Sequence, residues 1–378
     1  MFFTYFEPNK ISKKESNTLF FELLKNPEID LSDYKPQERK WKKTTRNIDN
    51  KYGINYYKKH PINIFKFHNL PIPNIPLESI SEHYHSFYIP KKTNPEKYRK
   101  IDAPNLELKI HQTIFKNFIE NELKANPHDA AHAYVKGRST ITAVQRHQKN
   151  ESKWFLKLDL KDFFPSHNKE YIMRMLKEVY PFAVFGDVKM NYIETIVDYA
   201  LLEDKLPQGT PISPLITNLC MVPIDFMITK TLQNFNKKHF VYTRYADDLL
   251  ISCKYKFKPG TVITAINKIF KHYNTPFVIN KEKTRFGSSA GRNWNLGIML
   301  NKDNNMTIGH KNNQKFRAML YDFIINKEQW SVEKAQETLG LISYYKAIEP
   351  DYIKYTIQKY NNKYHIDILK ELKNIIAN

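Results

Sequence analysis

The chain has 378 residues, with 59 Lys and Arg against 39 Asp and Glu, which gives a formal net charge of +20. Hydrophobic residues make up 41% of the chain and aromatic residues 14%, which excludes a wholly disordered protein, because this apolar surface can offset the entropy lost on ordering. The length allows two or three packed subdomains. Two cysteines are too few for a disulfide scaffold or a cysteine-rich zinc site, and they fit a reducing compartment.

Membrane insertion is not expected from the sequence. No stretch approaches the roughly 18 uninterrupted apolar residues of a membrane-spanning helix, and Met1–Glu7 has no basic segment ahead of an apolar one. We therefore expect a cytoplasmic protein with no membrane partner. The positive charge is spread over the whole length and favours nucleic acid as a partner. On composition alone, a basic surface that only maintains solubility remains an alternative.

The first 80 residues are rich in Lys and Asn and are repeatedly interrupted by proline. Short helices are expected at Ser12–Leu24 and around Pro61–Phe67, joined by extended segments, because proline removes a backbone donor and restricts the residue before it. We interpret residues 1–80 as an accessory region. Its lysines either contact nucleic acid or form a solvated basic surface.

A change of pattern at Tyr84 predicts a hairpin and then a helix. Phe87–Pro90 and Tyr98–Ile101 have the composition of short strands, and the residues between them are polar, as in a turn. From about Leu106 to Leu123, apolar residues recur at helical spacing.

The remaining periodic patterns predict one strand and a helical region. Side chains alternate in Phe155–Leu160, which places Asp159 on the polar face of a strand. After Gly309 the apolar residues recur at helical spacing to the end of the sequence, which indicates a helical bundle.

Two further carboxylates, Asp247 and Asp248, lie between the apolar runs Phe240–Tyr245 and Leu249–Cys253, which predicts a hairpin with both acids at its tip. Ionised carboxylates side by side repel and need a counter-charge. Their hard oxygen ligands indicate Mg²⁺, with Mn²⁺ as a substitute. Two such ions about 3.5–4 Å apart can activate a 3′-hydroxyl and stabilise a leaving pyrophosphate. The alternative is ordinary turn chemistry, which Asp also favours.

Three stretches, in this order, resemble the palm motifs of reverse transcriptases, and in detail those of bacterial retron-type enzymes. They are Leu-Asp-Leu-Lys-Asp-Phe-Phe-Pro-Ser at Leu158–Ser166, Pro-Gln-Gly-Thr-Pro-Ile-Ser-Pro at Pro207–Pro214 and Tyr-Ala-Asp-Asp at Tyr245–Asp248. The resemblance extends from about Tyr84 to Tyr345. It implies an α+β right-hand polymerase fold with fingers at 81–150, an antiparallel-sheet palm at 151–308 and a helical thumb at 309–378.

The resemblance also implies catalytic roles. Asp159 and Asp247 match the ligands of both metal ions, and Asp248 matches the third carboxylate beside them. Lys283 is similar to the lysine that protonates the leaving pyrophosphate as a general acid. Lys281, two residues away, is the alternative for that role.

Five positions match the family's deoxynucleotide site. Phe164 corresponds to the aromatic residue that excludes a ribose 2′-hydroxyl by steric clash, although a core aromatic is the alternative. Gln208 and Gly209 correspond to a turn against the incoming nucleotide, where glycine permits close backbone approach. Lys92 and Arg99 match the basic pair that grips the triphosphate, although either can be a solvated turn cation.

Two later segments resemble parts that hold nucleic acid. Asn293–Ile298 is similar to the hairpin that grips the primer end, and Leu339–Tyr345 to the thumb segment along the template–primer duplex. Gly340 inside a helix indicates a close approach either by nucleic acid or by a neighbouring helix.

The chain departs from retron enzymes in two places. Asn295–Leu300 lacks their Val-Thr-Gly element, and Ala143–His147 keeps the histidine but not the asparagine of an Asn-Ala-x-x-His element. Defence-associated and abortive-infection reverse transcriptases therefore remain alternatives to a retron enzyme. A group II intron enzyme is a weaker candidate, because only about seventy residues follow the palm.

The function implied is RNA-directed DNA synthesis on a dedicated structured non-coding RNA, with deoxynucleoside triphosphates as substrates and an RNA–DNA hybrid as product. Family analogy suggests an anti-phage defence setting with an effector protein. The alternatives are untemplated or protein-primed DNA synthesis and a non-catalytic RNA-binding protein that kept the polymerase scaffold.

Overall fold

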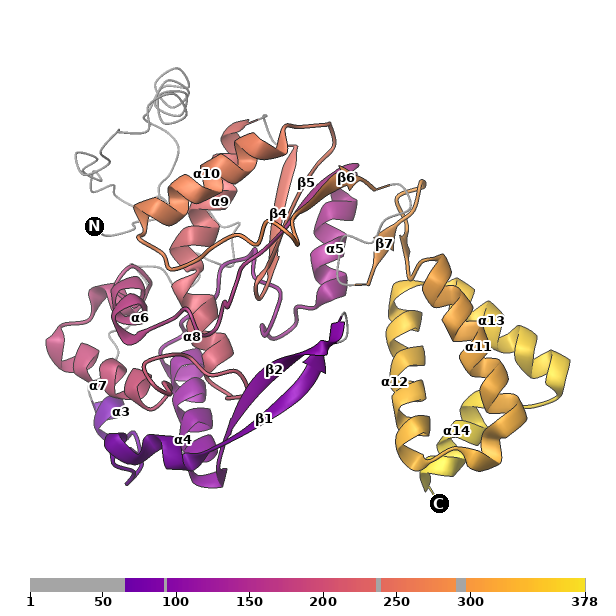
Figure 1. Cartoon of the computed structure of the whole chain (residues 1–378), viewed down its shortest axis with the longest axis horizontal. Helices are drawn as coiled ribbons and strands as arrows, with labels where there is room; N and C mark the ends of the chain where they lie inside the picture. Colours follow the sequence, from indigo (N-terminus) through magenta and orange to yellow (C-terminus); the bar gives the residue numbers. More distant parts are fainter. Residues whose placement is uncertain (1–64, 92–93, 236–238, 290–296, 378) are drawn as a thin grey trace. The chain divides into compact units, whose positions relative to one another are not determined.

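The computed structural model describes residues 65–91, 94–235, 239–289 and 297–377 (Figure 1). The helix expected at Ser12–Leu24, the residue Lys92 and most of the expected primer-gripping segment lie outside these ranges. The chain divides into two compact units. Of the described residues, those within 65–136, 158–249 and 258–284 form the first unit, and those within 137–157, 250–257 and 285–377 form the second.

The predicted hairpin and the helix that follows it lie in the first unit, and both are confirmed. Strands β1 and β2 pair antiparallel, with Tyr84 opposite Pro104 and Ile89 opposite Arg99. The following helix opens on an N-cap, since the Asn105 side chain accepts the Leu108 N–H, and it ends in a π-helical turn. The elements of this part are α3 (Phe65–His68), η3 (Leu77–His83), β1 (Tyr84–Lys91), β2 (Asn94–Pro104), α4 (Leu106–Asn117) and η4 (Phe118–Glu122).

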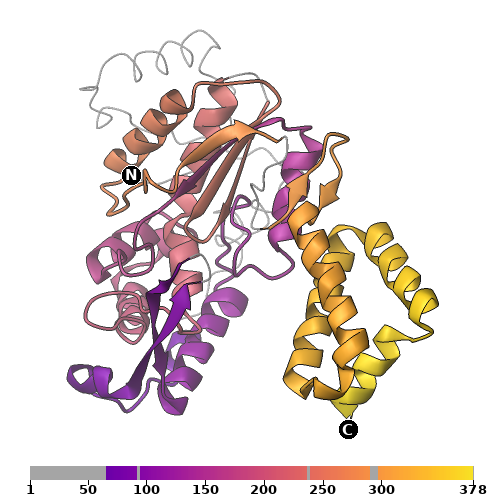
Figure 2. The same cartoon turned by 45° about the vertical axis from the view of Figure 1, so that its right-hand side comes forward.

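The predicted strand and carboxylate hairpin are also present, in a four-stranded sheet of order β4-β5-β3-β6. Helix α9 lies along β4 and packs against α10, as Figures 1 and 2 show. The strands are β3 (Trp154–Asp159), β4 (Phe240–Tyr245), β5 (Asp248–Cys253) and β6 (Arg285–Ser288). The helices are α6 (Lys169–Leu176), η5 (Phe182–Val184), α7 (Asp187–Asp198), α8 (Ser213–Cys220), α9 (Val222–Phe235) and α10 (Pro259–His272).

Strand β3 differs from its expected two-faced character. Leu156 and Leu158 are buried as predicted, but Phe155 and Asp159 on the opposite face are buried as well. Alternation in the sequence does not show that other elements will cover both faces of a strand. When they do, residues on the face expected to be exposed are buried as well. Asp159 is therefore a buried carboxylate, only 5% exposed.

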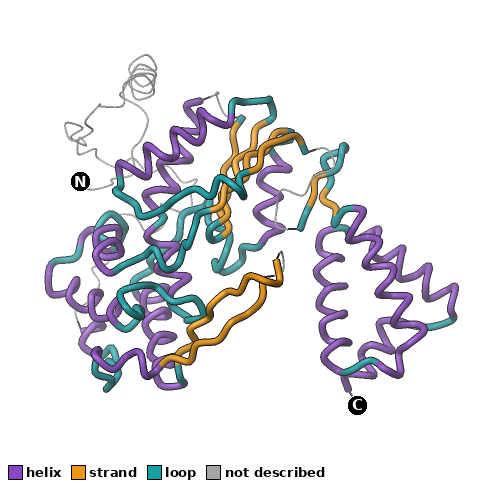
Figure 3. The backbone as a smooth tube through the Cα atoms, in the orientation of Figure 1, coloured by secondary structure: helices purple, strands orange, loops and turns teal. Residues whose placement is uncertain are grey.

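The second unit contains the predicted C-terminal helices, drawn in purple like every helix in Figure 3. They pack in a hydrophobic core that also includes Phe155 of β3 and Leu250 of β5. Phe316, Phe323, Trp330, Ile342 and Ile353 belong to this core. The elements are α5 (Thr140–Lys149), β7 (Met299–Leu300), β8 (Met306–Thr307), α11 (His310–Asn326), η6 (Lys327–Gln329), α12 (Val332–Ile348), α13 (Pro350–Tyr364) and α14 (Ile368–Ala377).

Within the described ranges, no single helix has both the length and the hydropathy to cross a membrane. Helices α8 and α9 satisfy that test only when taken together, across a bend of 43°.

Candidate active site

The backbone brings the end of β3 next to the turn between β4 and β5. Asp159 is the last residue of β3, and Asp248 is the first residue of β5. The N–H of Leu160 donates to the carbonyl oxygen of Asp247 at 3.0 Å. Two acidic segments that lie almost ninety residues apart in the sequence are therefore neighbours in the first unit.

The three carboxylates interact electrostatically. Burial, followed by the charges of Asp248 and Asp159, raises the pKa of the Asp247 carboxyl to about 6, whereas Lys283 opposes the shift. A raised pKa means that the ionised form is disfavoured here. A cation at this point would relieve the repulsion and favour ionised Asp247.

The residues present fit a divalent cation. Asp159 Oδ1 is buried and accepts no hydrogen bond from the described residues, while Oδ2 accepts one from Lys283 Nζ at 3.0 Å. Nowhere in the described part of the chain do three or more His, Cys, Asp and Glu side chains converge as ligands. Mg²⁺, however, is usually held by one or two carboxylates together with water and substrate phosphates. Asp159, Asp247 and Asp248 supply oxygen donors of that kind.

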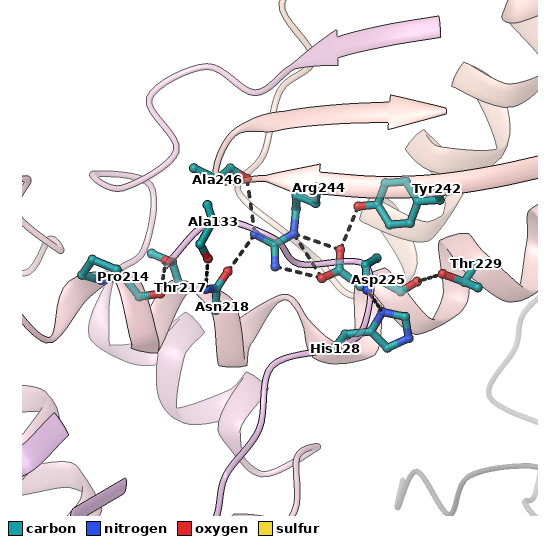
Figure 4. A network of polar contacts seen from close by, with 11 residues as sticks. His128, Ala133, Pro214, Thr217, Asn218, Asp225, Thr229, Tyr242, Arg244 and Ala246 are labelled. Carbon is teal, nitrogen blue, oxygen red and sulfur yellow. Dashed lines mark hydrogen bonds and ion pairs between the residues drawn. The ribbon is translucent and has the colours of Figure 1, made fainter. Parts of the chain in front are cut away.

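The turn that carries Asp247 is held by a buried arginine (Figure 4). Ala246 adopts a left-handed backbone conformation with φ of 55°, which is uncommon for a residue other than glycine. Its carbonyl oxygen accepts a hydrogen bond from Arg244 Nη1 at 3.3 Å, and the same nitrogen donates to Asn218 Oδ1 at 3.0 Å. Arg244 thus connects the turn that carries Asp247 to helix α8.

Asp225 of α9 neutralises this arginine. Its two carboxylate oxygens accept hydrogen bonds from Arg244 Nε and Nη2 at 2.8–3.1 Å, and Tyr242 Oη donates to Oδ1 at 2.8 Å. Both charged side chains are fully buried. Our reading of the sequence missed this pair. The available signal was a single acid within an apolar helix and a single base within an apolar strand.

The two neighbouring phenylalanines after β3 have different environments. Phe163 is buried and packs against His167 and Phe277, with ring centroids 5.1 and 5.5 Å away. Phe164 is half-buried, and its ring meets Phe163 at 5.7 Å and Tyr134 at 6.3 Å. Phe163 is thus the core aromatic of the pair, while Phe164 keeps an exposed side.

The turn at Gln208 and Gly209 lies against strand β2. The N–H of Asp102 donates to the carbonyl oxygen of Gln208 at 2.7 Å. A Cβ on Gly209 would lie 2.7 Å from Ile101 Cγ2 and 3.0 Å from the Asp102 carbonyl oxygen. The close neighbour that requires glycine in the described structure is therefore this strand, where the sequence had suggested a nucleotide.

Two of the three basic residues expected at the site, Arg99 and Lys283, lie within the described ranges. Arg99 is exposed on β2 and lies within electrostatic reach of Tyr134. Lys283 pairs with Asp159 through a side chain that is 61% exposed. Its position favours it over Lys281 for contact with the carboxylates. Lys92 is outside the described residues.

The later segments are only partly described. Of the expected primer-gripping segment, Gly297 and the buried Ile298 fall within the described ranges. The thumb segment Leu339–Tyr345 lies in α12. A Cβ at Gly340 would meet no described atom within 4 Å, so the described helices do not explain this glycine by close packing.

Comparison with known proteins identifies the family. Residues 89–317, more than half of the chain, match the family described as reverse transcriptase (RNA-dependent DNA polymerase). The chain belongs to the reverse transcriptase family. This reverse transcriptase is 30% identical to the retron Ec73 reverse transcriptase of Escherichia coli over 275 residues, which cover 71% of this chain and 84% of that protein. The retron Ec83 enzyme of the same species is 27% identical over 285 residues, with coverages of 74% and 87%.

These similarities confirm a bacterial retron-type reverse transcriptase with the polymerase fold and RNA-directed DNA polymerase activity. Among solved structures, a telomerase from Candida albicans, determined with a fragment of telomeric RNA, has a TM-score of 0.42 and 11% identity. The match covers 86% of this chain and 65% of the telomerase.

Proposed function

We propose that this reverse transcriptase copies a dedicated structured non-coding RNA into DNA by two-metal nucleotidyl transfer in the cytoplasm. The observation that carries the proposal is the buried Oδ1 of Asp159, which accepts no hydrogen bond from any described residue and lies on the segment beside the turn of Asp247 and Asp248. Bound Mg²⁺ would supply Lewis-acid activation of the attacking 3′-hydroxyl and stabilisation of the leaving oxygen. By family analogy alone, we also propose a role in anti-phage defence, with an effector protein as a further partner.

The side chains around the carboxylates have separate roles in this proposal. Arg99, together with Lys92, binds the triphosphate, because a guanidinium can donate two hydrogen bonds to phosphate oxygens. Phe164 excludes the 2′-hydroxyl of a ribonucleotide. Gln208 and Gly209 form the turn beside the incoming nucleotide. Lys283 delivers a proton to the pyrophosphate as it leaves.

Replacement of Asp247 by Asn tests the metal assignment. Incorporation should fall by roughly 10³-fold or more, because several kcal/mol of transition-state stabilisation are lost. Binding of RNA in a filter assay should persist. Asp303→Asn, at an exposed carboxylate of the second unit, serves as the control and should remain active. Full incorporation by Asp247→Asn would reject the assignment.

Sequencing of the nucleic acid that co-purifies with the enzyme tests the template. A single defined RNA joined to complementary DNA is the expected result. Homopolymeric or random DNA would instead indicate untemplated or protein-primed synthesis, and intron RNA would indicate a group II-like enzyme.

A further inference from the structure

The loop that precedes Tyr134 is fixed to the strand that leads into the catalytic turn. The backbone N–H of Arg244 donates to the Ala130 carbonyl oxygen at 2.6 Å, and the N–H of His132 donates to the Arg244 carbonyl oxygen at 2.8 Å. One residue further on, Asn218 Nδ2 donates to the carbonyl oxygen of Ala133 at 2.9 Å. Figure 4 shows Asn218 between Ala133 and Arg244. The loop and the Asp247 turn therefore share one buried support.

Tyr134, which directly follows Ala133, has an unusual backbone conformation. Its φ is 58°, a left-handed value that is rare for a bulky side chain. Such outliers persist where the surrounding structure over-determines them, and they concentrate at functional sites. The residue is 57% exposed, so burial of the ring in the core does not account for the conformation.

The rings of Tyr134 and Phe164 meet edge to face. The two centroids are 6.3 Å apart and the planes are inclined by 74°, an edge-to-face arrangement within the favourable range for aromatic pairs. The ring of Phe163 also contacts Phe164, with centroids 5.7 Å apart. The phenol of Tyr134 also lies within electrostatic reach of Asp247 and Arg99. Tyr134 is therefore at the candidate nucleotide site, although no motif identified it.

We propose that Tyr134 is a positioning residue that determines sugar selectivity by holding the ring of Phe164 in place. This inference rests on the proposed function, in which Phe164 excludes the 2′-hydroxyl. The Phe164 ring can exclude a ribonucleotide by steric clash only if it cannot rotate away from the 2′-hydroxyl. The rings of Phe163 and Tyr134 both contact the Phe164 ring, and in this proposal each contact restricts its rotation.

Three substitutions of Tyr134 distinguish the contributions of its ring, its hydroxyl and its backbone conformation. Tyr134→Phe keeps the ring, Tyr134→Ala removes it, and Tyr134→Asn removes it while tolerating the left-handed backbone. The measurement is kcat/KM for one deoxynucleotide and for the matching ribonucleotide on a defined RNA template. The ratio should fall about tenfold in Tyr134→Ala and Tyr134→Asn through a gain in ribonucleotide use, a loss of about 1.4 kcal/mol of discrimination. Tyr134→Phe should keep the ratio.

Two controls distinguish this inference from the proposed function. Phe164→Ala should lower the same ratio, and Tyr355→Ala, at an exposed tyrosine of α13, should not. If Phe164→Ala lowers the ratio but Tyr134→Ala and Tyr134→Asn do not, the role of Tyr134 is rejected, while the role of Phe164 in sugar selectivity is retained. A loss of selectivity in Tyr134→Phe would also reject it, by assigning the effect to the hydroxyl. If Phe164→Ala has no effect on the ratio, the proposed roles of Phe164 and Tyr134 in sugar selectivity are both rejected. The loss of incorporation in Asp247→Asn tests the polymerase site separately.

Discussion

The ammonium nitrogen of Lys283 lies 3.0 Å from Oδ2 of Asp159, the carboxylate proposed to hold both metal ions. In the absence of a cation, Lys283 thus supplies part of the counter-charge that this acidic group needs. The same side chain is proposed to protonate pyrophosphate. A lysine and a metal ion that share one carboxylate compete for it.

Replacement of Lys283 by Met is therefore expected to have two opposite effects. The Mg²⁺ concentration for half-maximal activity should fall, because a competing cation is removed. Turnover at saturating Mg²⁺ should also fall, by about 10²–10⁴-fold, the usual contribution of a general acid. A Mg²⁺ titration of single-nucleotide incorporation measures both. Lys281→Met is the matched control, and a larger effect there would transfer the role to Lys281.

The raised pKa of Asp247 predicts a gain in stability when its charge is removed. Above pH 6 the folded protein contains a carboxylate that burial and like charges disfavour, so Asp247→Asn should raise the free energy of unfolding by about 1–3 kcal/mol in EDTA. Thermal unfolding at pH 7.5 measures this. Added Mg²⁺ should stabilise the wild type more than the variant. A less stable variant in EDTA would contradict the electrostatic account.

Gly209→Ala should weaken nucleotide binding through strand β2. The new Cβ would overlap Ile101 and the Asp102 carbonyl at a φ of 120°, so the turn and the strand must separate. Because Arg99 lies on that strand, KM for the deoxynucleotide should rise about tenfold, or 1.4 kcal/mol, with a smaller change in kcat. Gly186→Ala is the control, since a Cβ there meets nothing within 4 Å. An unchanged KM in Gly209→Ala would show that Arg99 does not depend on this contact.

We expect the buried His167 to lower the free energy of unfolding in acid. Burial lowers the pKa of this imidazole to about 4, and its Nε2 has no hydrogen-bond partner among the described residues. The unfolded chain binds a proton near pH 6.5, so stability is fully present above that pH and falls by about 1.4 kcal/mol per unit towards pH 4. Denaturant unfolding at pH 7, 6 and 5 measures this slope.

His167→Asn keeps a donor near Nδ1, which lies 2.7 Å from the Phe163 carbonyl oxygen, but cannot titrate. The acid-dependent loss should therefore become smaller in this variant. His310→Asn, at an exposed histidine, is the control. An equal slope in the wild type and His167→Asn would remove His167 as the cause.

Local patterns predicted much of the fold. The strands around Asp247, the fingers hairpin and the C-terminal helices all follow from periodicity within short segments, and they are present. The pairing of Arg244 with Asp225 did not follow, because a buried charge is indistinguishable in sequence from an exposed one. The contact of Tyr134 with Phe164 also required the fold, since it joins residues thirty positions apart.

The hydrophobic core of the second unit has an evolutionary consequence. Asp159, Asp247, Asp248, Phe164 and Lys283 all belong to the first unit, whereas the core of the C-terminal helices includes Phe155 and Leu250 from the strands that carry Asp159 and Asp248. Substitutions in these helices that leave Phe155 and Leu250 in place need not disturb the reacting groups, because effects at distant sites are usually additive. Sequence diversification among related enzymes should therefore concentrate in the C-terminal helices, while the residues around Asp159 and Asp247 stay constant.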